Sequence, residues 1–344
     1  MRAWELQEFG LNNLTLVERA EPVPGAGQVK LRVKAASLNS RDLQVIYDKY
    51  DPNQRLPIVP VSDGVGEVVE LGVGVSRVAV GDRVVGAFAQ GWMAGERTWE
   101  KWLTHVGGHY DGMLQEYVVL EGDGVVAVPA YLSDVEAAAA SVAAATAWQA
   151  LVVQGHLKAG ETVLVEGTGG VSLFALQFAM AAGARVIVTS SSDAKIARAL
   201  ELGAWHGVNY VTEPDWGQAV LELTAGEGVD HVIENAGDLG QSVDALRPGG
   251  LVSLIGYLSQ LNLTSADPPS YRYELDIVTA LLKNVRLQGI SAAPRESYES
   301  MFRAMETSEL RPVIDRQYDL ANAIEAFVSL RDDGAFGKIC IDIC

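Results

Sequence analysis

An apolar strand followed at once by a glycine-rich turn and a long apolar helix is the feature that most restricts the fold of this chain. Residues 163–172 read Val-Leu-Val-Glu-Gly-Thr-Gly-Gly-Val-Ser. A glycine at 167 permits the tight turn, those at 169 and 170 let the main chain approach a phosphate group, and the free amides at the helix start attract anions. The segment predicts a dinucleotide-binding loop, with a plain strand-to-helix turn as the alternative. The residues expected to face the pyrophosphate are Gly167, Thr168, Gly169, Gly170 and Val171.

Around this loop, strand patterns alternate with helical patterns. Strand-like segments at 162–167, 184–190, 207–211, 229–237 and 250–256 alternate with helical segments at 170–183, 193–203, 215–224 and about 239–246. Helices between successive strands make those strands parallel and cover both faces of the sheet. We therefore predict an α/β chain with a doubly wound parallel sheet of the Rossmann type, and a sixth strand at 284–290.

The end of the second strand of this sheet indicates which nicotinamide cofactor fits. An acidic residue there holds the ribose 2′-hydroxyl of NAD, whereas a cation accepts the 2′-phosphate of NADP. The chain offers Ser190, Ser191 and Lys195 at this place, which favours NADP (NADPH). Asp193 is interpreted as an acid of the N-cap or first helical turn, with a ribose contact as the alternative.

Residues 1 to about 130 follow a different pattern, in which short strands are separated by glycine-containing turns. This pattern predicts a compact, barrel-like β domain. The alanine-rich segment 137–153 follows the helix-start residues Ser133, Asp134 and Glu136. It predicts one buried or interdomain helix, because polar residues interrupt it too often for a membrane span.

Charge and cysteine content exclude several classes of function. The chain has 26 Lys and Arg against 44 Asp and Glu, a net charge of −18 that repels nucleic acid and acidic lipid. Its only cysteines are Cys340 and Cys344, which excludes a disulfide framework or a cysteine zinc cluster in the body of the chain. The first residues show no apolar signal segment. We expect a cytoplasmic protein that acts on a small molecule, without a nucleic-acid or membrane partner.

Motifs spread along nearly the whole chain carry a family resemblance. They lie at 35–42 (AASLNSRD), 56–86, 112–120, 144–151 (AATAWQAL), 167–187, 199–204, 247–250 (RPGG) and 337–339 (GKI). On these motifs the chain resembles the medium-chain dehydrogenase/reductase superfamily. Within it, the chain is similar to the zinc-independent, quinone-oxidoreductase-like branch, whose members are often called zinc-type alcohol dehydrogenase-like.

The resemblance implies a domain organisation. A GroES-like, partly closed β-barrel forms the catalytic domain and begins with residues 1–130. A Rossmann domain occupies 131–267, and residues 268–344 supply its last strand and return to the catalytic domain. The resemblance also implies a homodimer, in which the sixth strand pairs with its copy, since an exposed sheet edge is a template for another strand.

The metal ligands of the zinc-containing relatives are missing. Asn39 stands where those relatives carry a cysteine, and Ser62 and Asp63 stand where they carry a histidine and an acid. The loop that corresponds to their structural zinc site, about 88–115, contains no cysteine. Two glycines separate His105 from His109, so we interpret these as surface histidines and predict no metal.

Without zinc to polarise a carbonyl, the hydride acceptor must itself delocalise the developing charge, as quinones and α,β-unsaturated carbonyls do. By resemblance, Asn39 lies near the nicotinamide, with a turn-forming role as the alternative. Tyr50 donates to the developing oxyanion, with a structural tyrosine as the alternative, and Tyr47 is a weaker candidate. Further cofactor contacts are implied at Thr146, Tyr210, Ile255, Gly256, Gly289, Ile290 and Lys338.

Several other residues carry specific expectations. Ser172 replaces the usual third glycine of the loop, which a small serine allows at a modest shift. Arg41 is expected to pair with Asp42, with a phosphate contact as the alternative, and Asp63 to tie a loop. The tryptophans expected to form a local cluster, with a lid or an oligomer contact as the alternative, are Trp92, Trp99 and Trp102.

Together these features predict a zinc-independent, NADPH-dependent oxidoreductase that transfers hydride to a quinone or an α,β-unsaturated carbonyl compound. Two alternatives stay open. The first is a zinc-free alcohol or aldehyde oxidoreductase. The second is a non-catalytic NADPH-binding protein.

Overall fold

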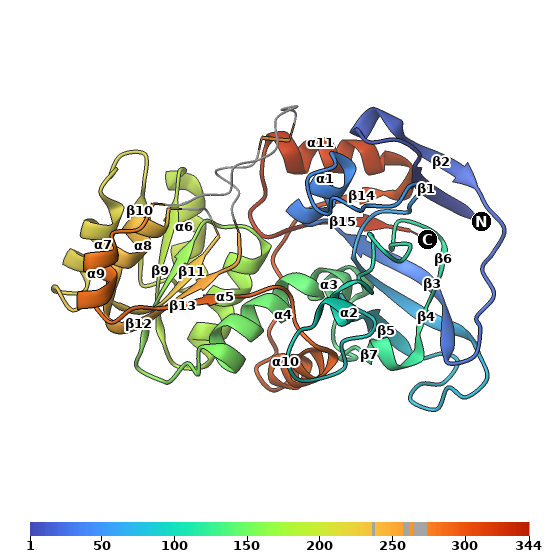
Figure 1. Ribbon diagram of the computed structural model, residues 1–344, viewed down its shortest axis with the longest axis horizontal. Helices are drawn as coiled ribbons and strands as arrows, with labels where there is room; N and C mark the ends of the chain where they lie inside the picture. The colour runs from blue at the N-terminus through green and yellow to red at the C-terminus, as the bar shows by residue number, and fades with distance from the viewer. Residues whose placement is uncertain (236–237, 257–261, 264–273, 344) are drawn as a thin grey trace. The chain divides into compact units, whose positions relative to one another are not determined.

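The computed structural model describes the whole chain except residues 236–237, 257–261, 264–273 and 344 (Figure 1). The residue contacts divide the chain into two units. Unit 1 comprises residues 1–145 and 292–344, and unit 2 comprises residues 146–291. Unit 1 therefore contains segments from both ends of the sequence, and unit 2 is one continuous segment between them.

A six-stranded parallel sheet forms the centre of unit 2 (Figure 1). Its strands are β8 (Thr162–Glu166), β9 (Arg185–Ser190), β10 (His206–Asn209), β11 (Val229–Glu234), β12 (Leu246–Leu254) and β13 (Arg286–Gly289). They run in the order β10-β9-β8-β11-β12-β13, and each neighbouring pair is parallel. The order reverses direction between β8 and β11, as in a Rossmann sheet, so the predicted doubly wound α/β fold is confirmed.

Helices follow the strands at the places the sequence predicts. They are α5 (Gly170–Ala181), α6 (Asp193–Glu201), α7 (Trp216–Leu223) and α8 (Leu239–Ala245), and a further helix, α9 (Ile277–Leu282), precedes β13. The strand β8 is apolar throughout its centre, where Val163, Leu164 and Val165 are fully buried. A run of buried residues without alternation is typical of a strand that is covered on both faces.

Unit 1 is built on a seven-stranded sheet. Its strands are β3 (Gln28–Ser37), β4 (Asp63–Leu71), β5 (Arg83–Gly86), β6 (Tyr117–Glu121), β7 (Val125–Ala127), β14 (Ile314–Asp319) and β15 (Lys338–Asp342). The order is β14-β15-β3-β4-β5-β7, with β6 paired to β3. Because β15 pairs antiparallel with β3, placing Cys340 opposite Ser37, one sheet joins strands that lie about 300 residues apart in the sequence.

The remaining elements of unit 1 are short. A separate two-stranded sheet joins β1 (Arg2–Leu6) to β2 (Leu14–Glu18). The helices are α1 (Ser40–Ile46), α2 (Trp99–Trp102), α3 (Asp134–Ala139), α10 (Arg295–Thr307) and α11 (Ala323–Asp332). Within the described residues, no helix combines the length and the apolar character that are needed to cross a membrane.

The single helix predicted over 137–153 is wrong. The segment forms the end of α3, then α4 (Val142–Trp148), and then a π-helical turn at Gln149–Gln154. The predicted start is confirmed, because Ser133 and Glu136 form a capping box at the beginning of α3. The sequence carries no glycine or proline between Ala137 and Val153, so it gives no signal for the break after Ala139.

The unit boundaries also differ from the domain limits that the resemblance implies. The Rossmann domain is expected from residue 131, whereas unit 2 begins at Thr146. The cause is α3, which packs against β3, β4 and β15 of unit 1. The expected limit between 267 and 268 lies outside the described residues, and the contacts place the return to unit 1 at Ala292.

Candidate active site

The glycine-rich loop leaves the first amides of α5 open. Gly167 has a φ of 75°, a left-handed conformation that glycine adopts without strain. Gly169 is the N-cap of α5 and supplies no side-chain cap. Among the described residues, no heavy atom lies within 4 Å of the position that a Cβ on Gly169 would take. Within the part of the chain that the structure describes, the start of this 12-residue helix is therefore uncovered at Gly169, which suits a phosphate group.

Ser172 fits in the place of the third glycine and braces the loop. Its side chain is buried. The Oγ atom donates to the carbonyl oxygen of Glu166 at 2.8 Å and accepts from Nδ2 of Asn235 at 3.2 Å. The serine thus connects the end of β8 to the residue that follows β11.

The parallel sheet brings most of the predicted cofactor residues to one edge. Because the strands are parallel, their carboxyl ends lie at the same edge of the sheet. The residues at or just beyond these ends are Gly167, Thr168, Gly169, Gly170, Val171, Ser190, Ser191, Ile255, Gly256, Gly289 and Ile290. Tyr210 follows β10, and its N–H donates to the carbonyl oxygen of Ser190 at 3.2 Å. Thr146 is separate from this group, since it lies buried within α4.

The end of β9 presents hydroxyls and an ammonium group. Ser190 is buried and its Oγ accepts from the N–H of Ser192, whereas Ser191 is exposed. Ser192 is the N-cap of α6, so Asp193 lies in the first helical turn. The carboxylate of Asp193 accepts from Nδ2 of Asn209 at 2.7 Å. No described residue bonds the ammonium of Lys195, which therefore is available to an anionic ligand.

In unit 1, Asn39 and Lys338 form the centre of a buried polar network. The ammonium of Lys338, whose residue is 3% exposed, donates to Oδ1 of Asn39 at 2.5 Å and to the carbonyl oxygen of Leu38 at 2.8 Å. It also lies 3.6 Å from Oδ2 of Asp63. Asp63 accepts from the hydroxyl of Ser62 at 2.8 Å and from the N–H of Val142 at 3.1 Å, so it ties a loop as expected.

Arg41 and Asp42 form the ion pair that the sequence predicts. Nη1 of Arg41 lies 3.1 Å from Oδ1 of Asp42 and donates to the carbonyl oxygen of Gly107 at 2.9 Å. The Asp42 carboxylate also accepts from the N–H of Asn39 at 2.8 Å, which fixes the start of α1. Burial raises the pKa of Asp42, and the charge of Arg41 opposes that rise.

Tyr50 lies half-buried beside Arg41, whose Cζ atom is 4.3 Å from the centre of the tyrosine ring. Burial raises the pKa of Tyr50 above its ordinary value of 10, with Arg41 acting in the opposite direction. The phenol is therefore a hydrogen-bond donor at neutral pH and not a base. Tyr47 is engaged differently, because its hydroxyl accepts from Nη1 of Arg331 at 3.0 Å.

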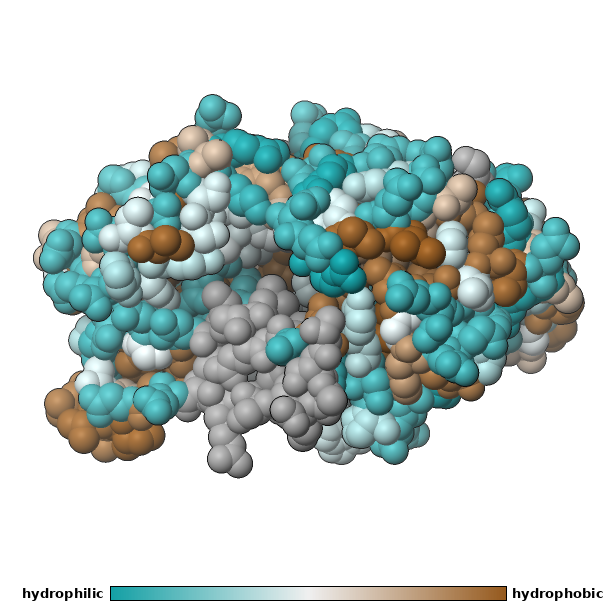
Figure 2. Space-filling view, turned by 90° about the horizontal axis from the view of Figure 1, so that it is seen from above, coloured by the Kyte–Doolittle hydropathy of each residue, from teal (hydrophilic) through white to brown (hydrophobic). Residues whose placement is uncertain are grey.

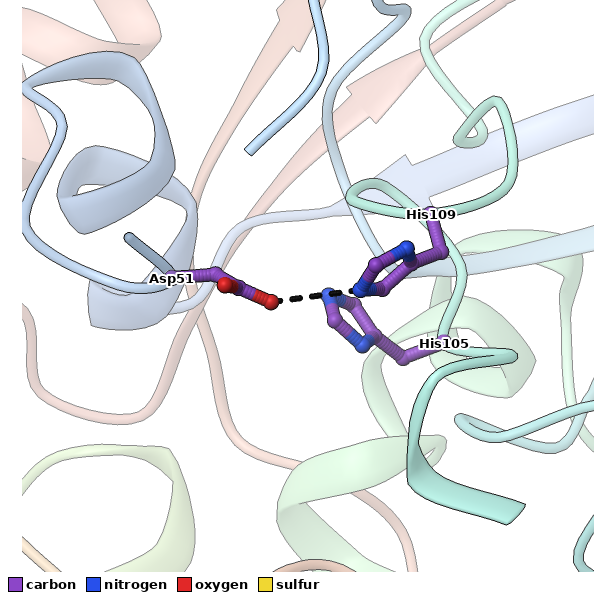
Figure 3. A group of neighbouring side chains, drawn as sticks. All are labelled: Asp51, His105 and His109. Atoms are coloured by element: carbon purple, nitrogen blue, oxygen red, sulfur yellow. Dashed lines mark hydrogen bonds and ion pairs between the residues drawn. The ribbon is translucent and has the colours of Figure 1, made fainter. Parts of the chain in front are cut away.

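The interpretation of His105 as a surface histidine is wrong, whereas the side chain of His109 is partly exposed. His105 is 0% exposed, and its ring centre lies 4.8 Å from that of His109, with the rings nearly perpendicular. Gly107, with a φ of 68°, turns the chain back so that residues four apart meet in a loop instead of along a helix. Nε2 of His109 lies 3.2 Å from Oδ2 of Asp51, which completes a group of three possible metal ligands (Figure 3).

The expected tryptophan cluster forms only in part. Trp92 is buried and packs with Phe88, and Trp102 lies partly buried against the same group. Trp99 is 72% exposed, and the guanidinium of Arg97 lies between it and Trp102, 4.5 and 4.4 Å from their ring centres. Burial in this cluster lowers the pKa of His105 to about 3.

Zinc does not fit at the positions where the zinc-containing relatives carry their ligands. The ammonium of Lys338 lies between Asn39 and Asp63, two of those three positions. A cation that is already bound there, with an amide in place of a thiolate, removes the ligand set that zinc requires.

Comparisons with known proteins agree with this geometry. The profile of the alcohol dehydrogenase GroES-like domain matches residues 25–130, and that of the zinc-binding dehydrogenase family matches residues 170–307. A zinc-type alcohol dehydrogenase-like protein of Schizosaccharomyces pombe is 38% identical over 327 residues, covering 92% of this chain and 91% of that protein.

Two further proteins show how far the similarity extends. The crystal structure of an NAD-dependent alcohol dehydrogenase is 32% identical and superposes with a TM-score of 0.87, covering 100% of both chains. An acryloyl-coenzyme A reductase of Metallosphaera sedula is 28% identical over 333 residues, covering 94% of this chain and 95% of that protein. The chain thus belongs to the medium-chain dehydrogenase/reductase superfamily, among the zinc-type alcohol dehydrogenase-like proteins, a family of oxidoreductases that use a nicotinamide cofactor.

Proposed function

We propose that this chain is an NADPH-dependent reductase that delivers hydride to a quinone or an α,β-unsaturated carbonyl compound without a catalytic metal. The observation that carries the proposal is the ammonium of Lys338 between Asn39 and Asp63, where zinc-dependent relatives hold their metal. With no Lewis acid at this place, a simple ketone would lack the polarisation that hydride transfer requires.

The acceptor must then spread the developing charge over its own atoms. The bound nicotinamide supplies the hydride, and a conjugated acceptor receives it as a phenolate or an enolate. The similarity to an acryloyl-coenzyme A reductase supports this substrate class, because acryloyl-coenzyme A is a conjugated thioester.

The chain's own residues orient the acceptor and donate hydrogen bonds. Lys338 fixes Oδ1 of Asn39, so the amide Nδ2 points away from the lysine; Nδ2 makes one long contact, 3.4 Å, with the Ser62 hydroxyl. This N–H is placed to donate to the substrate oxygen. Tyr50 supplies a second donor, since its raised pKa keeps the phenol protonated.

NADPH is the proposed cofactor because of the groups at the end of β9. Ser191 is exposed and Lys195 has an ammonium that no described residue bonds. The nearest acid, Asp193, is held by Asn209 at 2.7 Å. A 2′-phosphate gains charge-assisted hydrogen bonds from these groups, whereas the 2′-hydroxyl of NAD would have to share the Asp193 carboxylate with Asn209.

The test is oxidation of NADPH by purified, chelator-treated protein with quinones, conjugated enones and saturated aldehydes. We expect turnover with the first two classes and a lower KM for NADPH than for NADH. Oxidation of simple alcohols by NADP would instead support the zinc-free alcohol dehydrogenase. Tight NADPH binding without turnover of any acceptor would support the binding protein and end the proposal.

A homodimer through the edge of the unit 2 sheet is part of the proposal. The edge strand β13 is exposed along its length. Beside it, α9 presents Ile277, Val278, Leu281 and Leu282, which are 67%, 64%, 72% and 75% exposed, as an apolar patch (Figure 2, lower left). Four large apolar side chains on one short helix are typical of a surface that a partner covers.

A further inference from the structure

We infer that Asp51, His105 and His109 form a binding site for a divalent transition-metal ion, for which zinc matches the ligand set best. The three side chains come from two loops of unit 1 and converge (Figure 3). One ligand atom from each lies within 4.8 Å of the others. Two imidazoles and a carboxylate are a recurrent ligand set for zinc, with a fourth position left for water. The group uses none of Asn39, Ser62 and Asp63. His105 and His109 lie in the loop at about 88–115 that corresponds to the structural zinc site of the relatives, but the ligands here are imidazoles and a carboxylate instead of cysteines.

His105 is prepared as a ligand. Its Nδ1 lies 3.1 Å from the carbonyl oxygen of Trp102, and a carbonyl only accepts, so the proton is on Nδ1. Nε2 then carries a lone pair, and this buried atom has no hydrogen-bond partner. A metal-binding histidine generally has this arrangement, in which a backbone carbonyl fixes the tautomer and the other nitrogen coordinates. An unpartnered buried nitrogen is costly unless something binds it.

Gly108 makes room for this nitrogen. A Cβ at residue 108 would lie 2.1 Å from Nε2 of His105, closer than atoms can approach. Only glycine therefore allows the imidazole to turn toward His109 and Asp51. The sequence His-Val-Gly-Gly-His at 105–109 therefore places a glycine where a larger residue would block the His105 ring.

His109 and Asp51 are already paired. Nε2 of His109 lies 3.2 Å from Oδ2 of Asp51, and Oδ1 of Asp51 accepts from the N–H of Asn53 at 2.8 Å. A metal ion at this place would take the position of the proton between His109 and Asp51. Zinc bonds of about 2.1 Å separate tetrahedral ligands by about 3.4 Å, close to the separation of this pair. His109 and Asp51 are partly exposed, so they are free to adjust toward His105.

The two arginines nearby are each paired with a carboxylate. Arg41 faces His105 from α1, and its charge is paired with the buried carboxylate of Asp42 at 3.1 Å. Arg55 donates to the carbonyl oxygen of His109, and its guanidinium is paired with Asp111 at 3.2 Å. The charge of Arg41 still lowers the pKa of His105, so the carboxylate of Asp51 must offset a nearby cation when a metal ion binds. A bound ion would connect the loop after α1 to the loop after α2.

The test is titration of chelator-treated protein with Zn²⁺ in a calorimeter, and with Co²⁺ followed by its visible absorption. We expect one ion per chain, a tetrahedral Co²⁺ spectrum without a thiolate charge-transfer band, and a rise in Tm with Zn²⁺. Asp51→Asn and His109→Gln each remove one partly exposed ligand and should weaken binding by at least about 100-fold. Exposed His156, changed to Gln, is the matched control and should leave binding unchanged.

Three results would overturn the inference. The first is that neither ion shows saturable binding. The second is that the wild type and both ligand variants bind the ion equally well. The third is a Co²⁺ spectrum typical of thiolate ligation, which would assign the ion to a cysteine. Because the readout is metal binding, the outcome does not depend on whether the proposed reductase activity is found. A folded His109→Gln protein, checked by circular dichroism, keeps the comparison valid if Asp51→Asn is unstable.

Discussion

The ammonium of Lys338 donates to the amide oxygen of Asn39 at 2.5 Å, across 299 positions of sequence. Through this bond a lysine of β15 orients the asparagine at the N-cap of α1. It makes the C-terminal strand a part of the candidate active site.

Lys338→Met should destabilise unit 1 by about 3 kcal/mol, because it leaves Asp63 buried without its cation. Asp63 is 0% exposed and Lys338 is 3% exposed, so water does not replace the lost charge. Urea unfolding measures the change. In Lys338→Met/Asp63→Asn, part of the stability should return; a double variant as unstable as the sum of the single changes would show that the two residues do not interact.

Lys195→Ala should raise the KM for NADPH about tenfold and leave the KM for NADH unchanged, since one charge-assisted bond to a phosphate contributes about 1.5 kcal/mol or more. Steady-state kinetics with both cofactors measure this. Lys158→Ala is the control, because Lys158 precedes β8 and so lies at the opposite end of that strand. An equal loss for NADH and NADPH would argue against a 2′-phosphate contact.

Tyr50→Phe should lower kcat about 100-fold, in the range found when one donor to an oxyanion is removed. Because burial raises the pKa of Tyr50 above 10, the wild-type phenol should stay protonated, and its ionisation should not limit the rate below pH 10. A pH profile of kcat tests this. Tyr47→Phe, which removes only the hydroxyl that accepts from Arg331, should retain most of the activity.

His105 should make the protein sensitive to acid. Its pKa is about 3 in the folded state and 6.5 as the ordinary value, so the unfolded chain binds one more proton between these limits. Stability is therefore fully present above pH 6.5 and falls by about 1.4 kcal/mol for each pH unit as the pH drops toward 3. Urea unfolding at several pH values should show a shallower dependence for His105→Gln. Parallel curves for the two proteins would contradict the buried, neutral histidine.

Leu281→Glu/Leu282→Glu should convert the proposed dimer into monomers, because two charges replace side chains that are 72% and 75% exposed on α9. Analytical ultracentrifugation measures the mass. Val73→Glu changes an apolar residue of unit 1 that is 85% exposed and should leave the mass unchanged. A wild type that sediments as a monomer would end the proposal.

The sequence predicts unit 2 well because its strands are strongly apolar and its loop residues are specific. Val163–Val165 and the glycines that follow them identify β8, and the carboxyl edge of a parallel sheet then places Ser190 and Gly289 on the same side. Local pattern and global topology agree here, so periodicity is sufficient.

The secondary structure and the site residues of unit 1 are harder to predict from sequence, because contacts between distant segments determine them. The strand β14 reads Ile-Asp-Arg-Gln-Tyr-Asp, and these mostly polar residues give no apolar strand pattern. The segment is a strand because it pairs with β15. Helix α1 depends on a cap formed by Asn39 and Asp42 instead of on an apolar stripe. The meeting of His105 with Asp51 joins two loops, and no periodic pattern reports such a contact.

The pairing of β15 with β3 also has a consequence for how the protein is made. Translation delivers β3 about 300 residues before β15, so the edge of β3 that receives β15 stays unpaired until residues 338–342 have left the ribosome. Unit 2, a single continuous segment, is complete before that moment. The nascent chain therefore carries a complete unit 2 while the strand edge in unit 1 is still open, and this interval is when aggregation or chaperone capture competes with folding.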